Sequence, residues 1–589
     1  MKNILVLIIL FTTLNAFSKT YYVSSQTELD NAISNIQGGD TIILLNSGSP
    51  YKDIRIKIKF TANSLAPVVI KAETVGDVIL TGNSRIQMGG AYIFIEGLTF
   101  SGTDAPDKLT GNGAIEFRYS TDESDWCYNC KIKNILFNAY NQPDNQKTEV
   151  LKWVRIYGQD NSVVNCSFIN KHGVGNCITI ERPDDKANRA LIYNNYFANR
   201  TPVTDANGKV LNDQDAIRVG SSTYSLSSSN SIIYNNYFYN WNGEAEIISN
   251  KSGENEYFGN TFQKCVGTLT LRHGTHCQVY NNWFFGENLP KSGGIRIIDS
   301  DHKIYNNYFQ DLDADNSKVA GAINLYKGDE DFVSGGVLSS YAICEDNLIA
   351  FNTIVNCDIG IWIGPDVSDR EYAPKNLEIK NNLLIKCSNA VLASSLPEGN
   401  NIIQGNIKQS GQWWSGFDTN ENLSTDSSIL QLDENNGFYR IFESSKAVSY
   451  GYTTSYTPNF DIMQGQRDAQ PDAGAEEYNG KGNILPYTQN DLNKIVGVIP
   501  DKTTGLNEYL FENIKIFPNP TTNTLSIKSN YSFKKIVIYN VKGMKVIEKK
   551  FNNTIRLAKI AIDNLESGIY YIDIVKETNI VFNSKFIKL

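Results

Sequence analysis

The stretch IIYNNYF, residues 232–238, indicates the fold because variants of it return along the middle of the chain. Each variant has an apolar or aromatic run, an asparagine, one further residue and an aromatic side chain. The closing residues Phe238, Phe262, Phe284 and Phe309 are 24, 22 and 25 residues apart. A repeat of this length predicts a solenoid whose coils bury their apolar faces by stacking on one another. The related segments are LIYNNYF (191–197), YFGNTF (257–262), VYNNWF (279–284) and IYNNYF (304–309).

The repeated segments predict strands, because they are short, rich in β-branched and aromatic residues, and lack a 3.6-residue period. Leucines at the spacing of a leucine-rich repeat are missing. We therefore predict an all-β chain whose main part is a right-handed parallel β-helix, with phenylalanines inside and an asparagine ladder at the turns. The longer gap between Phe197 and Phe238 predicts an inserted loop near 201–213. The predicted ladder residues are Asn195, Asn236, Asn260, Asn282 and Asn307.

The 589 residues divide into four predicted regions. Residues 1–18 combine a lysine, an apolar run too short to cross a bilayer, and small or polar residues, which predicts a cleaved secretory signal. The β-helix is predicted over 19–485, followed by a linker over 486–510. Residues 511–589 read as alternating strands and predict a small C-terminal β-sandwich. No other long apolar run occurs, so the mature chain is expected to have no transmembrane segment.

The charge and the cysteines exclude two classes of function. The net charge of -9 gives no overall positive field for phosphates, so we expect no nucleic-acid partner. An anionic partner then requires a local basic site. Nine cysteines are scattered, and the single CxxC at Cys127 and Cys130 has no second pair at zinc-finger spacing. We predict that most of the cysteines are small buried residues.

The tail resembles a known family. Its segments FPNPTTNTLSI (517–527), IVIYNVKGMKV (536–546), LESGIYYIDI (565–574) and KFIKL (585–589) are similar to the C-terminal sorting domain of the type IX secretion system. The resemblance implies export through the periplasm by that machinery, followed by release or attachment at the cell surface. The alternative interpretation is a carbohydrate-binding β-sandwich.

The segment 244–274 contains charged residues whose spacing matches the repeat. Lys251 and Arg272 are 21 residues apart, about one coil, which predicts positions on adjacent coils about 4.8 Å apart. Arg296 follows 24 residues later and belongs one coil beyond. Glu244 and Glu246 point the same way if both lie in a strand. Lys251 has the opposite parity to Glu246, so the chain must bend between them if all these groups face one groove.

These residue types suit β-elimination from a uronate polymer. Carboxylate and amide oxygens are ligands for Ca²⁺, which neutralises the sugar carboxylate and makes the C5 proton more acidic. A lysine beside other cations has its pKa lowered, so it becomes a better base. An arginine stabilises developing negative charge, or protonates the leaving oxygen with help from water.

The same region resembles polysaccharide lyase family 6, the family of alginate lyases and chondroitinase B. The similar segments are LNDQDAIRVGSSTYSLSSSNS (211–231), EAEIISNKS (244–252), GTLTLRHG (267–274) and GGIRIID (293–299). The resemblance implies a β-helix lyase domain and a secreted, monomeric enzyme that acts on alginate. It also implies roles for eight residues: Lys251 as base, Arg272 as acid, Asn212, Glu244 and Glu246 as Ca²⁺ ligands, and Arg218, His273 and Arg296 as substrate contacts.

The chain departs from the family pattern at one place. Many members read NGGE where this chain has NDQD at 212–215, so Asp215 replaces a glutamate and Asp213 adds a charge beside Asn212. Arg218 has an alternative role, a salt bridge that stabilises the inserted loop. His273 has one as well, an indirect contact behind the residues that touch substrate.

Three other functions remain open. Chondroitinase B activity on dermatan sulfate would require extra basic residues along the groove, and no such cluster is evident in the sequence. Hydrolysis of pectin would require a carboxylic acid and base, for which Asp184, Asp185, Asp213 and Asp215 are candidates, but it leaves Lys251 and Arg272 without a role. A non-catalytic surface protein that binds polysaccharide is the third possibility.

Overall fold

The computed structural model describes residues 18–103, 113–365, 370–487, 491–492, 514–517, 521–540, 545–566, 568–576 and 579–588. The chain forms two compact units, Met1–Ile499 and Pro500–Leu589. Residues 1–17 of the predicted signal peptide, and most of the predicted linker over 486–510, lie outside the described residues. Within the described part of the chain, no helix has the length and apolar character needed to span a bilayer.

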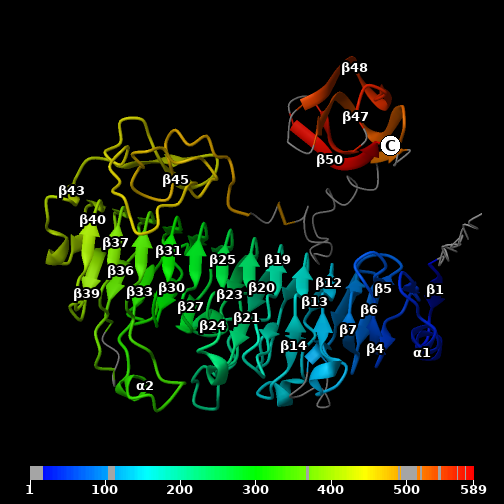
Figure 1. Cartoon of the computed structure of the whole chain (residues 1–589), viewed down its shortest axis with the longest axis horizontal. Helices are drawn as coiled ribbons and strands as arrows, with labels where there is room; N and C mark the ends of the chain where they lie inside the picture. Colours follow the sequence, from blue (N-terminus) through cyan, green and yellow to red (C-terminus); the bar gives the residue numbers. More distant parts are fainter. Residues whose placement is uncertain are drawn as a thin grey trace, which may run out of the picture. The chain divides into compact units, whose positions relative to one another are not determined.

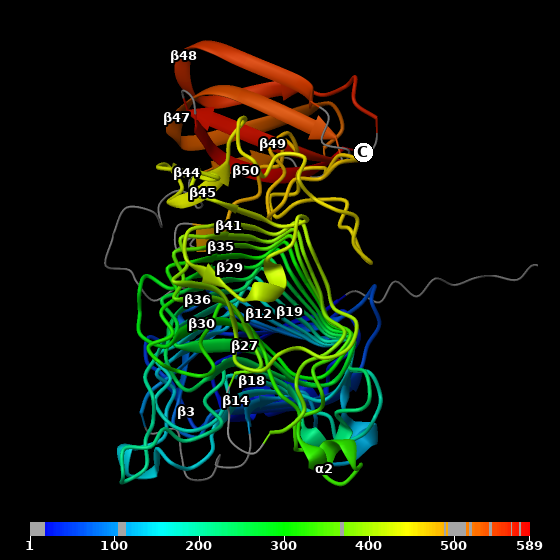
Figure 2. The ribbon, with the colours of Figure 1, turned by 90° about the vertical axis from the view of Figure 1, so that its left-hand side faces the viewer.

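The first unit is a parallel β-helix, as predicted. Its strands run in three long parallel sheets, which we name A, B and C, and successive coils stack strand on strand (Figure 1). Viewed along the long axis of this unit, the coils superpose and enclose a continuous interior (Figure 2). Sheet C carries the candidate site.

The strands of each sheet have the following bounds, in chain order. Sheet A contains β1 (Thr20–Val23), β2 (Thr41–Leu44), β5 (Val68–Ala72), β8 (Ile93–Glu96), β12 (Lys131–Lys133), β16 (Ser162–Val164), β19 (Leu191–Tyr193), β22 (Ile232–Tyr234), β25 (Glu256–Phe258), β28 (Gln278–Tyr280), β31 (Lys303–Tyr305), β34 (Leu348–Ala350), β37 (Glu378–Lys380) and β40 (Ile402–Gln404). Sheet B contains β3 (Tyr51–Lys52), β6 (Val78–Thr81), β9 (Leu98–Ser101), β13 (Leu136–Asn138), β17 (Ser167–Ile169), β20 (Tyr196–Arg200), β23 (Tyr237–Trp241), β26 (Thr261–Gln263), β29 (Trp283–Phe285), β32 (Tyr308–Gln310), β35 (Thr353–Val355), β38 (Leu383–Ile385), β41 (Ile407–Gln409) and β43 (Leu423–Thr425). Sheet C contains β4 (Arg55–Thr61), β7 (Arg85–Ala91), β10 (Gly113–Glu116), β11 (Cys127–Tyr128), β14 (Lys152–Ile156), β15 (Gly158–Gln159), β18 (Ile178–Ile180), β21 (Ile217–Gly220), β24 (Glu246–Lys251), β27 (Gly267–His273), β30 (Ser292–Ile297), β33 (Ile323–Leu325), β36 (Ile359–Ile363), β39 (Asn389–Ala393) and β42 (Gln412–Trp413).

The repeated motif performs the two tasks predicted for it. Phe238 stacks on Phe262 with 4.6 Å between ring centroids, and the other motif phenylalanines continue the stack inside the helix. Each predicted ladder asparagine donates from its amide to the side-chain oxygen of the next, at 2.9–3.0 Å. The residue before the ladder asparagine adopts positive φ, for example Asn235 at 53° and Asn281 at 54°. Asparagine tolerates this conformation better than most residues, so the motif turns the chain at each coil.

Connections and helices lie outside this regular stack. The inserted loop predicted near 201–213 is present between β20 and β21. Helix α1 (Gln26–Ser34) contacts the first coil, and helix α2 (Glu330–Val333) lies in the long connection between β33 and β36. All nine cysteines are buried and unpaired with one another, in agreement with the prediction for most of them. Within the described part of the chain there are four 3₁₀ helices: Glu123–Asp125, Asp144–Gln146, Ser222–Tyr224 and Ser415–Phe417.

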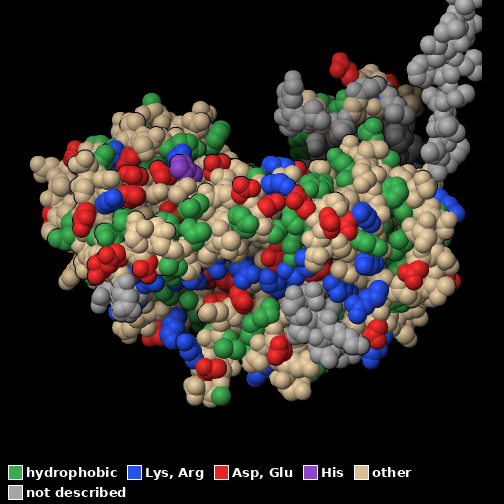
Figure 3. Space-filling view, turned by 60° about the horizontal axis from the view of Figure 1, so that its bottom comes forward, with side chains coloured by type: hydrophobic (Ala, Val, Ile, Leu, Met, Phe, Trp, Pro, Cys, Tyr) green, Lys and Arg blue, Asp and Glu red, His purple; other side chains and the backbone are tan. Residues whose placement is uncertain are grey.

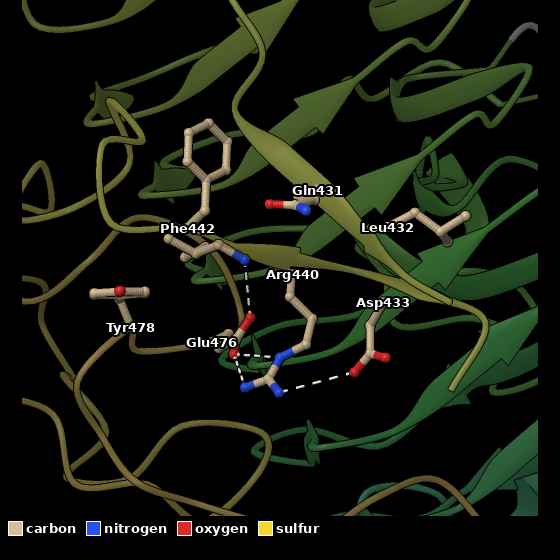
Figure 4. A pocket seen from close by; sticks show the side chains of 8 residues that line it. Gln431, Leu432, Asp433, Arg440, Phe442, Glu476 and Tyr478 are labelled. Atoms are coloured by element: carbon tan, nitrogen blue, oxygen red, sulfur yellow. Dashed lines mark hydrogen bonds and ion pairs between the residues drawn. The ribbon is translucent and has the colours of Figure 1, made fainter. Parts of the chain in front are cut away.

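After the last coil the chain returns along sheet B. The hairpin of β44 (Leu430–Asp433) and β45 (Phe438–Ile441), with the segment that follows it, forms an apolar cluster with side chains of sheet B such as Trp283. Beside the hairpin is a cavity of about 330 Å³ (Figure 4). Its arginine, Arg440, is neutralised by Glu476 and lies 4.0 Å from Asp433. The candidate site residues do not line this cavity.

The second unit is an antiparallel sheet, consistent with the predicted C-terminal β-sandwich. The first half of β47 pairs with β46 and the end of β48, and its second half pairs with β49 and the start of β48. Residues from both halves, including Leu525 and Ile538, share one apolar core. The strands are β46 (Ile514–Phe517), β47 (Thr524–Asn540), β48 (Lys545–Ala561), β49 (Gly568–Lys576) and β50 (Asn579–Lys588).

Candidate active site

The candidate site lies on the outer face of sheet C, where inward residues such as Ile217 and Ile248 alternate with outward ones. Because parallel pairing keeps register from coil to coil, outward side chains line up in rows across the strands. One such row contains Arg155, Thr179, Arg218, Ser249, Thr270 and Arg296.

A β-bulge in β24 supplies the bend that the sequence left open. Pairing with β27 shifts between Glu246 and Ile248, which leaves Ile247 as the extra residue. Ile247 and Ile248 are both fully buried in the core. Glu246 therefore faces outward together with Lys251, although regular alternation would place them on opposite faces. The bulge brings the carboxylate and the lysine into one groove.

A second register shift involves Arg272. Lys251 pairs with His273 while Asn250 pairs with Leu271, so Arg272 is the extra residue on β27. Lys251 is therefore not paired directly with Arg272, because the bulge shifts the register by one position. The two residues still lie on adjacent strands, and the Arg272 charge is a principal reason, after burial, that the pKa of Lys251 lies below its ordinary value.

Glu246 is the electrostatic centre of the group. Its carboxylate pairs with Arg296 from β30, and Arg272 Nη1 lies 3.5 Å from its Oε1. Burial alone would raise the pKa of Glu246, but Arg296 and then Arg272 outweigh that effect and hold the pKa below its ordinary value. Glu246 is thus ionised, and it fixes two arginine heads beside Lys251.

Lys251 remains available for chemistry. Its side chain is partly buried, and among the described residues no side chain hydrogen-bonds to its Nζ. Burial, then Arg272 and Arg218, lower its pKa, while Glu246 acts in the opposite direction. A lowered pKa increases the fraction of neutral amine near neutral pH, which is the form that can accept a proton.

His273 lies next to Lys251 as a neutral imidazole. It is almost fully buried, and burial followed by the charges of Arg272 and Lys251 lowers its pKa to about 3. Neither ring nitrogen has a hydrogen-bond partner among the described residues. A buried ring with both nitrogens unpaired is unusual, and its burial leaves almost none of its surface open to the groove in this structure.

Two tyrosines and an arginine that the sequence analysis did not identify complete the surroundings. Tyr341 lies against Arg272 at 5.6 Å, and Arg370 stacks on the same ring at 3.8 Å. Tyr326 lies 5.5 Å from Arg296. Tyr326 and Tyr341 come from the connection between β33 and β34, and Arg370 comes from the one between β36 and β37, so the spacing of the repeat gave no signal for them.

The other predicted metal ligands lie beside Glu246. Glu244 accepts the backbone N–H of Gln214 at 2.6 Å, and burial followed by the charges of Glu246 and Asp213 raises its pKa to about 7. Burial and the charges of Glu244 and Glu246 also raise the pKa of Asp215 well above its ordinary value. Asn212 is exposed and makes no side-chain hydrogen bond with a described residue.

The oxygen donors on this side of the site are of the chemical type that hard cations bind. Burial and then neighbouring carboxylates raise the pKa values of Glu244 and Asp215. Glu246 differs from Glu244 because two arginines already neutralise it. The described residues contain no group of three or more His, Cys, Asp or Glu side chains arranged around a common metal position.

Arg218 has the alternative role considered for it. Its Nη1 donates to Asp213 Oδ1 at 2.7 Å, which links the inserted loop to sheet C. It also lies close enough to lower the pKa of both Lys251 and Lys152, in each case after burial. Arg218 therefore connects the predicted catalytic group to basic residues of earlier coils.

A basic cluster, which the sequence analysis had not detected, occupies those earlier coils. Glu116 accepts from Arg85 at 3.0 Å, from Arg155 at 3.2 Å and from Arg118 at 3.3 Å. Glu181 accepts from Lys152 and from Arg155, both at 2.8 Å. The expectation that no basic residues cluster along the groove is therefore wrong, because these residues lie far apart in sequence and only the coils bring them together.

Comparison with known proteins agrees with this fold. A family model described as Chondroitinase B matches residues 23–444, and one described as Secretion system C-terminal sorting domain matches residues 515–589. Ulvan lyase NLR42 of Nonlabens ulvanivorans is 28% identical over 112 residues, which are 19% of this chain and 21% of that protein. The sorting-domain match points to export, with secretion or attachment at the cell surface.

Solved structures of polysaccharide lyases share the β-helix. The PL6 family alginate lyase AlyGC aligns with a TM-score of 0.66 at 24% identity, over 86% of this chain and 60% of AlyGC. The PL6 family polysaccharide lyase Pedsa3628 from Pseudopedobacter saltans aligns with a TM-score of 0.54 at 26% identity, over 66% of this chain and 92% of Pedsa3628. Because the family model spans more than half of the sequence, the chain belongs to the chondroitinase B family.

Proposed function

We propose that this chain is an exported polysaccharide lyase that cleaves alginate by β-elimination at a 4-linked uronate. The observation that carries the proposal is the placement of Lys251 and Arg272 on adjacent strands of one outer face, beside the Glu246–Arg296 pair. The likeness to PL6 alginate lyases supports the substrate class. The sorting domain supports delivery through the periplasm by the type IX machinery.

Each residue near Lys251 has a role in this proposal. Arg272, which is partly exposed and is held by Glu246, attracts the anionic sugar into the groove, while Arg296 neutralises and fixes Glu246. Neutral Lys251 takes the C5 proton, the C5–H electron pair forms the C4=C5 double bond, and the C4–O bond breaks. Arg272 stabilises the negative charge on the leaving oxygen, which receives a proton through water. His273 offers a neutral hydrogen-bonding ring beside the base.

Calcium is part of the proposal. Glu244 and Glu246, with Asn212 as an amide donor, would hold the ion, and Ca²⁺ when bound neutralises the C6 carboxylate and makes the C5 proton more acidic. The raised pKa of Glu244 supports a cation at this side, since an adjacent positive charge would restore the ionised carboxylate.

The deciding experiment follows the ultraviolet absorbance of the unsaturated uronate when the purified protein acts on alginate. Parallel reactions contain chelator, added Ca²⁺, or no addition. New reducing ends without unsaturated product would indicate hydrolysis, and binding without cleavage would indicate a non-catalytic protein. Either outcome contradicts the proposal.

The basic cluster favours a second candidate substrate, a sulfated uronate polysaccharide such as dermatan sulfate. Four cations surround Glu116 and Glu181, so excess positive charge is present along the groove. Cleavage of either polymer would give an unsaturated uronate, so the same absorbance assay can be run with dermatan sulfate. The rates on the two polymers then show which one is the substrate.

A further inference from the structure

The basic cluster contains more cations than carboxylates. We define it as Arg85, Arg118, Lys152 and Arg155 around Glu116 and Glu181. Glu116 is fully buried, while the three guanidinium groups that bind it keep 13–16% of their side-chain surface exposed. Arg118, then the Gly113 N–H, Arg85 and Arg155, overcome the effect of burial and hold the pKa of Glu116 below its ordinary value. The carboxylate is therefore ionised, and the cluster as a whole carries an excess of two positive charges.

The cluster is aligned with the candidate active site. Arg155 lies in the same outward row as Arg218, and β14 lies three strands before β24 in sheet C. With strands about 4.8 Å apart, this places Arg155 about 14 Å along the groove from the strand of Lys251. Glu116 lies one strand further. Arg218 lies between the cluster and the candidate active site, since its charge lowers the pKa of both Lys152 and Lys251.

The cluster is built to hold its cations in place. Arg118 stacks on Tyr157 at 4.2 Å and Arg155 on the same ring at 5.2 Å, so both guanidinium groups have fixed orientations. A guanidinium has five N–H donors, and the pairing of Arg118 with Glu116 occupies only part of the donors of Arg118. In Figure 3, where the lower side of Figure 1 comes forward, Lys and Arg side chains form a band along a hollow, with carboxylates among them.

We propose that the basic cluster forms distal subsites that bind the anionic groups, carboxylate or sulfate, of a uronate chain several sugars away from the bond that is cleaved. The proposal rests on the proposed function for its substrate class. In a chain with a net charge of -9, such a preorganised strip of positive charge would attract a polyanion along the groove. A long oligomer reaches both the cluster and Lys251, whereas a short one occupies only the sugars next to Lys251.

The test compares oligomer lengths in the full chain. Octamers and trimers of alginate and of dermatan sulfate are titrated calorimetrically against the Lys251→Ala protein, with or without Arg118→Gln or Lys152→Gln. Losing one charge-assisted contact weakens octamer binding by about tenfold, while trimer binding changes by less than about twofold. If the variants weaken binding of the alginate octamer, the cluster binds carboxylate groups. If they weaken binding of the dermatan sulfate octamer alone, it binds sulfate groups. Arg440→Gln is the matched control, since Arg440 is also paired with a carboxylate but lies on the returning hairpin.

Every outcome decides the inference. Equal weakening of trimer and octamer, no weakening of either, or absence of binding by both polymers overturns it. Thermal unfolding of each variant shows whether a loss of affinity reflects misfolding. Arg118 and Lys152 pair with different carboxylates, so one variant still tests the inference if the other fails to fold. The absorbance assay reports the proposed function separately: a protein that binds octamers through the cluster but yields no unsaturated product retains the distal subsites and loses the lyase assignment.

Discussion

Arg296 reaches Glu246 across an entire intervening strand. The two residues lie on β30 and β24, and on the intervening strand β27 Glu246 pairs with Thr268 while Arg296 pairs with Thr270. Both side chains are almost completely buried, with 6% and 7% of their surface exposed. Both β27 positions are threonines, whose short side chains the ion pair spans, so the site depends on short side chains as well as on the charged ones.

Removing one partner of this pair should be costly. Glu246→Gln leaves Arg296 buried without its counter-ion, and we expect a loss of about 3–5 kcal/mol in the free energy of unfolding. Arg296→Met should lose a similar amount, whereas the double variant should lose less than the sum, because neither charge is then left alone. Chemical denaturation of the four proteins measures the coupling. Additive losses would show that the pair does not interact in this way.

Lys251→Ala and Arg272→Ala should each reduce kcat by about 10²–10⁴-fold without reducing Tm by more than a few degrees, because each removes a reacting group at the edge of the groove. The absorbance assay and thermal unfolding measure both effects. Lys209→Ala, an exposed lysine of the inserted loop, should keep full activity. Full activity in either site variant would exclude the roles assigned to these residues.

The pH dependence of kcat/KM should show an ascending limb from deprotonation of Lys251. Because the pKa of Lys251 is lowered, the limb lies below the ordinary lysine range. Arg218 contributes to that lowering after burial and Arg272, so Arg218→Gln should raise the pKa of Lys251 and move the limb to higher pH. An unchanged limb in this variant would mean that another group controls the profile.

Glu244 should make the fold less stable as pH rises. Its pKa is raised from 4.5 to about 7 in the folded chain, so between these values the folded state holds a proton that the unfolded state has lost. Stability from this group is therefore present below about pH 4.5 and decreases as pH rises toward 7. As the pH rises across this window, the Tm of Glu244→Gln should increase relative to the Tm of the wild type.

The comparison isolates Glu244 from an opposing effect. His273, whose pKa is lowered to about 3, adds stability as pH rises, but both proteins retain it and its contribution cancels. Glu254→Gln, at an exposed carboxylate, is the control and should show no such trend. Saturating Ca²⁺ should reduce the difference if it binds beside Glu244.

Gln214 should position both the inserted loop and Glu244. Its fully buried side chain contacts Val203 and Leu211 of the loop and accepts from Arg200 at 3.2 Å, while its backbone holds Glu244. Gln214→Ala should cost about 1–3 kcal/mol because it leaves these buried groups unpaired. Limited proteolysis within 201–213 should also become faster. Unchanged cleavage and stability would contradict this role.

The fold could be predicted because its information is periodic. The motif around Phe238 and Asn236 recurs once per coil, so both the interior stack and the ladder follow from spacing alone. The bulges at Ile247 and Arg272 could not be predicted, since an extra residue in a strand has no distinctive composition. They nevertheless decide which side chains face the groove.

Other parts of the site depend on distant segments. Tyr341 and Arg370 lie in two different connections outside the repeat, and Arg85, Arg118 and Arg155 are separated by more than 30 residues each. Their proximity arises from coils of unequal length, which sequence spacing does not align. The resemblance of the segments around Lys251 and Arg272 to a lyase family therefore located the centre of the groove but not its extent.

The bulge at Ile247 also limits how this protein can change length during evolution. Insertions in the connections, such as the one between β20 and β21, leave the rows of sheet C in register. Deleting a single residue between Glu246 and Lys251 would make one of these two side chains point into the core. The carboxylate and the lysine would then lie on opposite faces of the sheet. Gains and losses of residues should therefore accumulate in the connections, while the length of β24 stays constant among functional descendants.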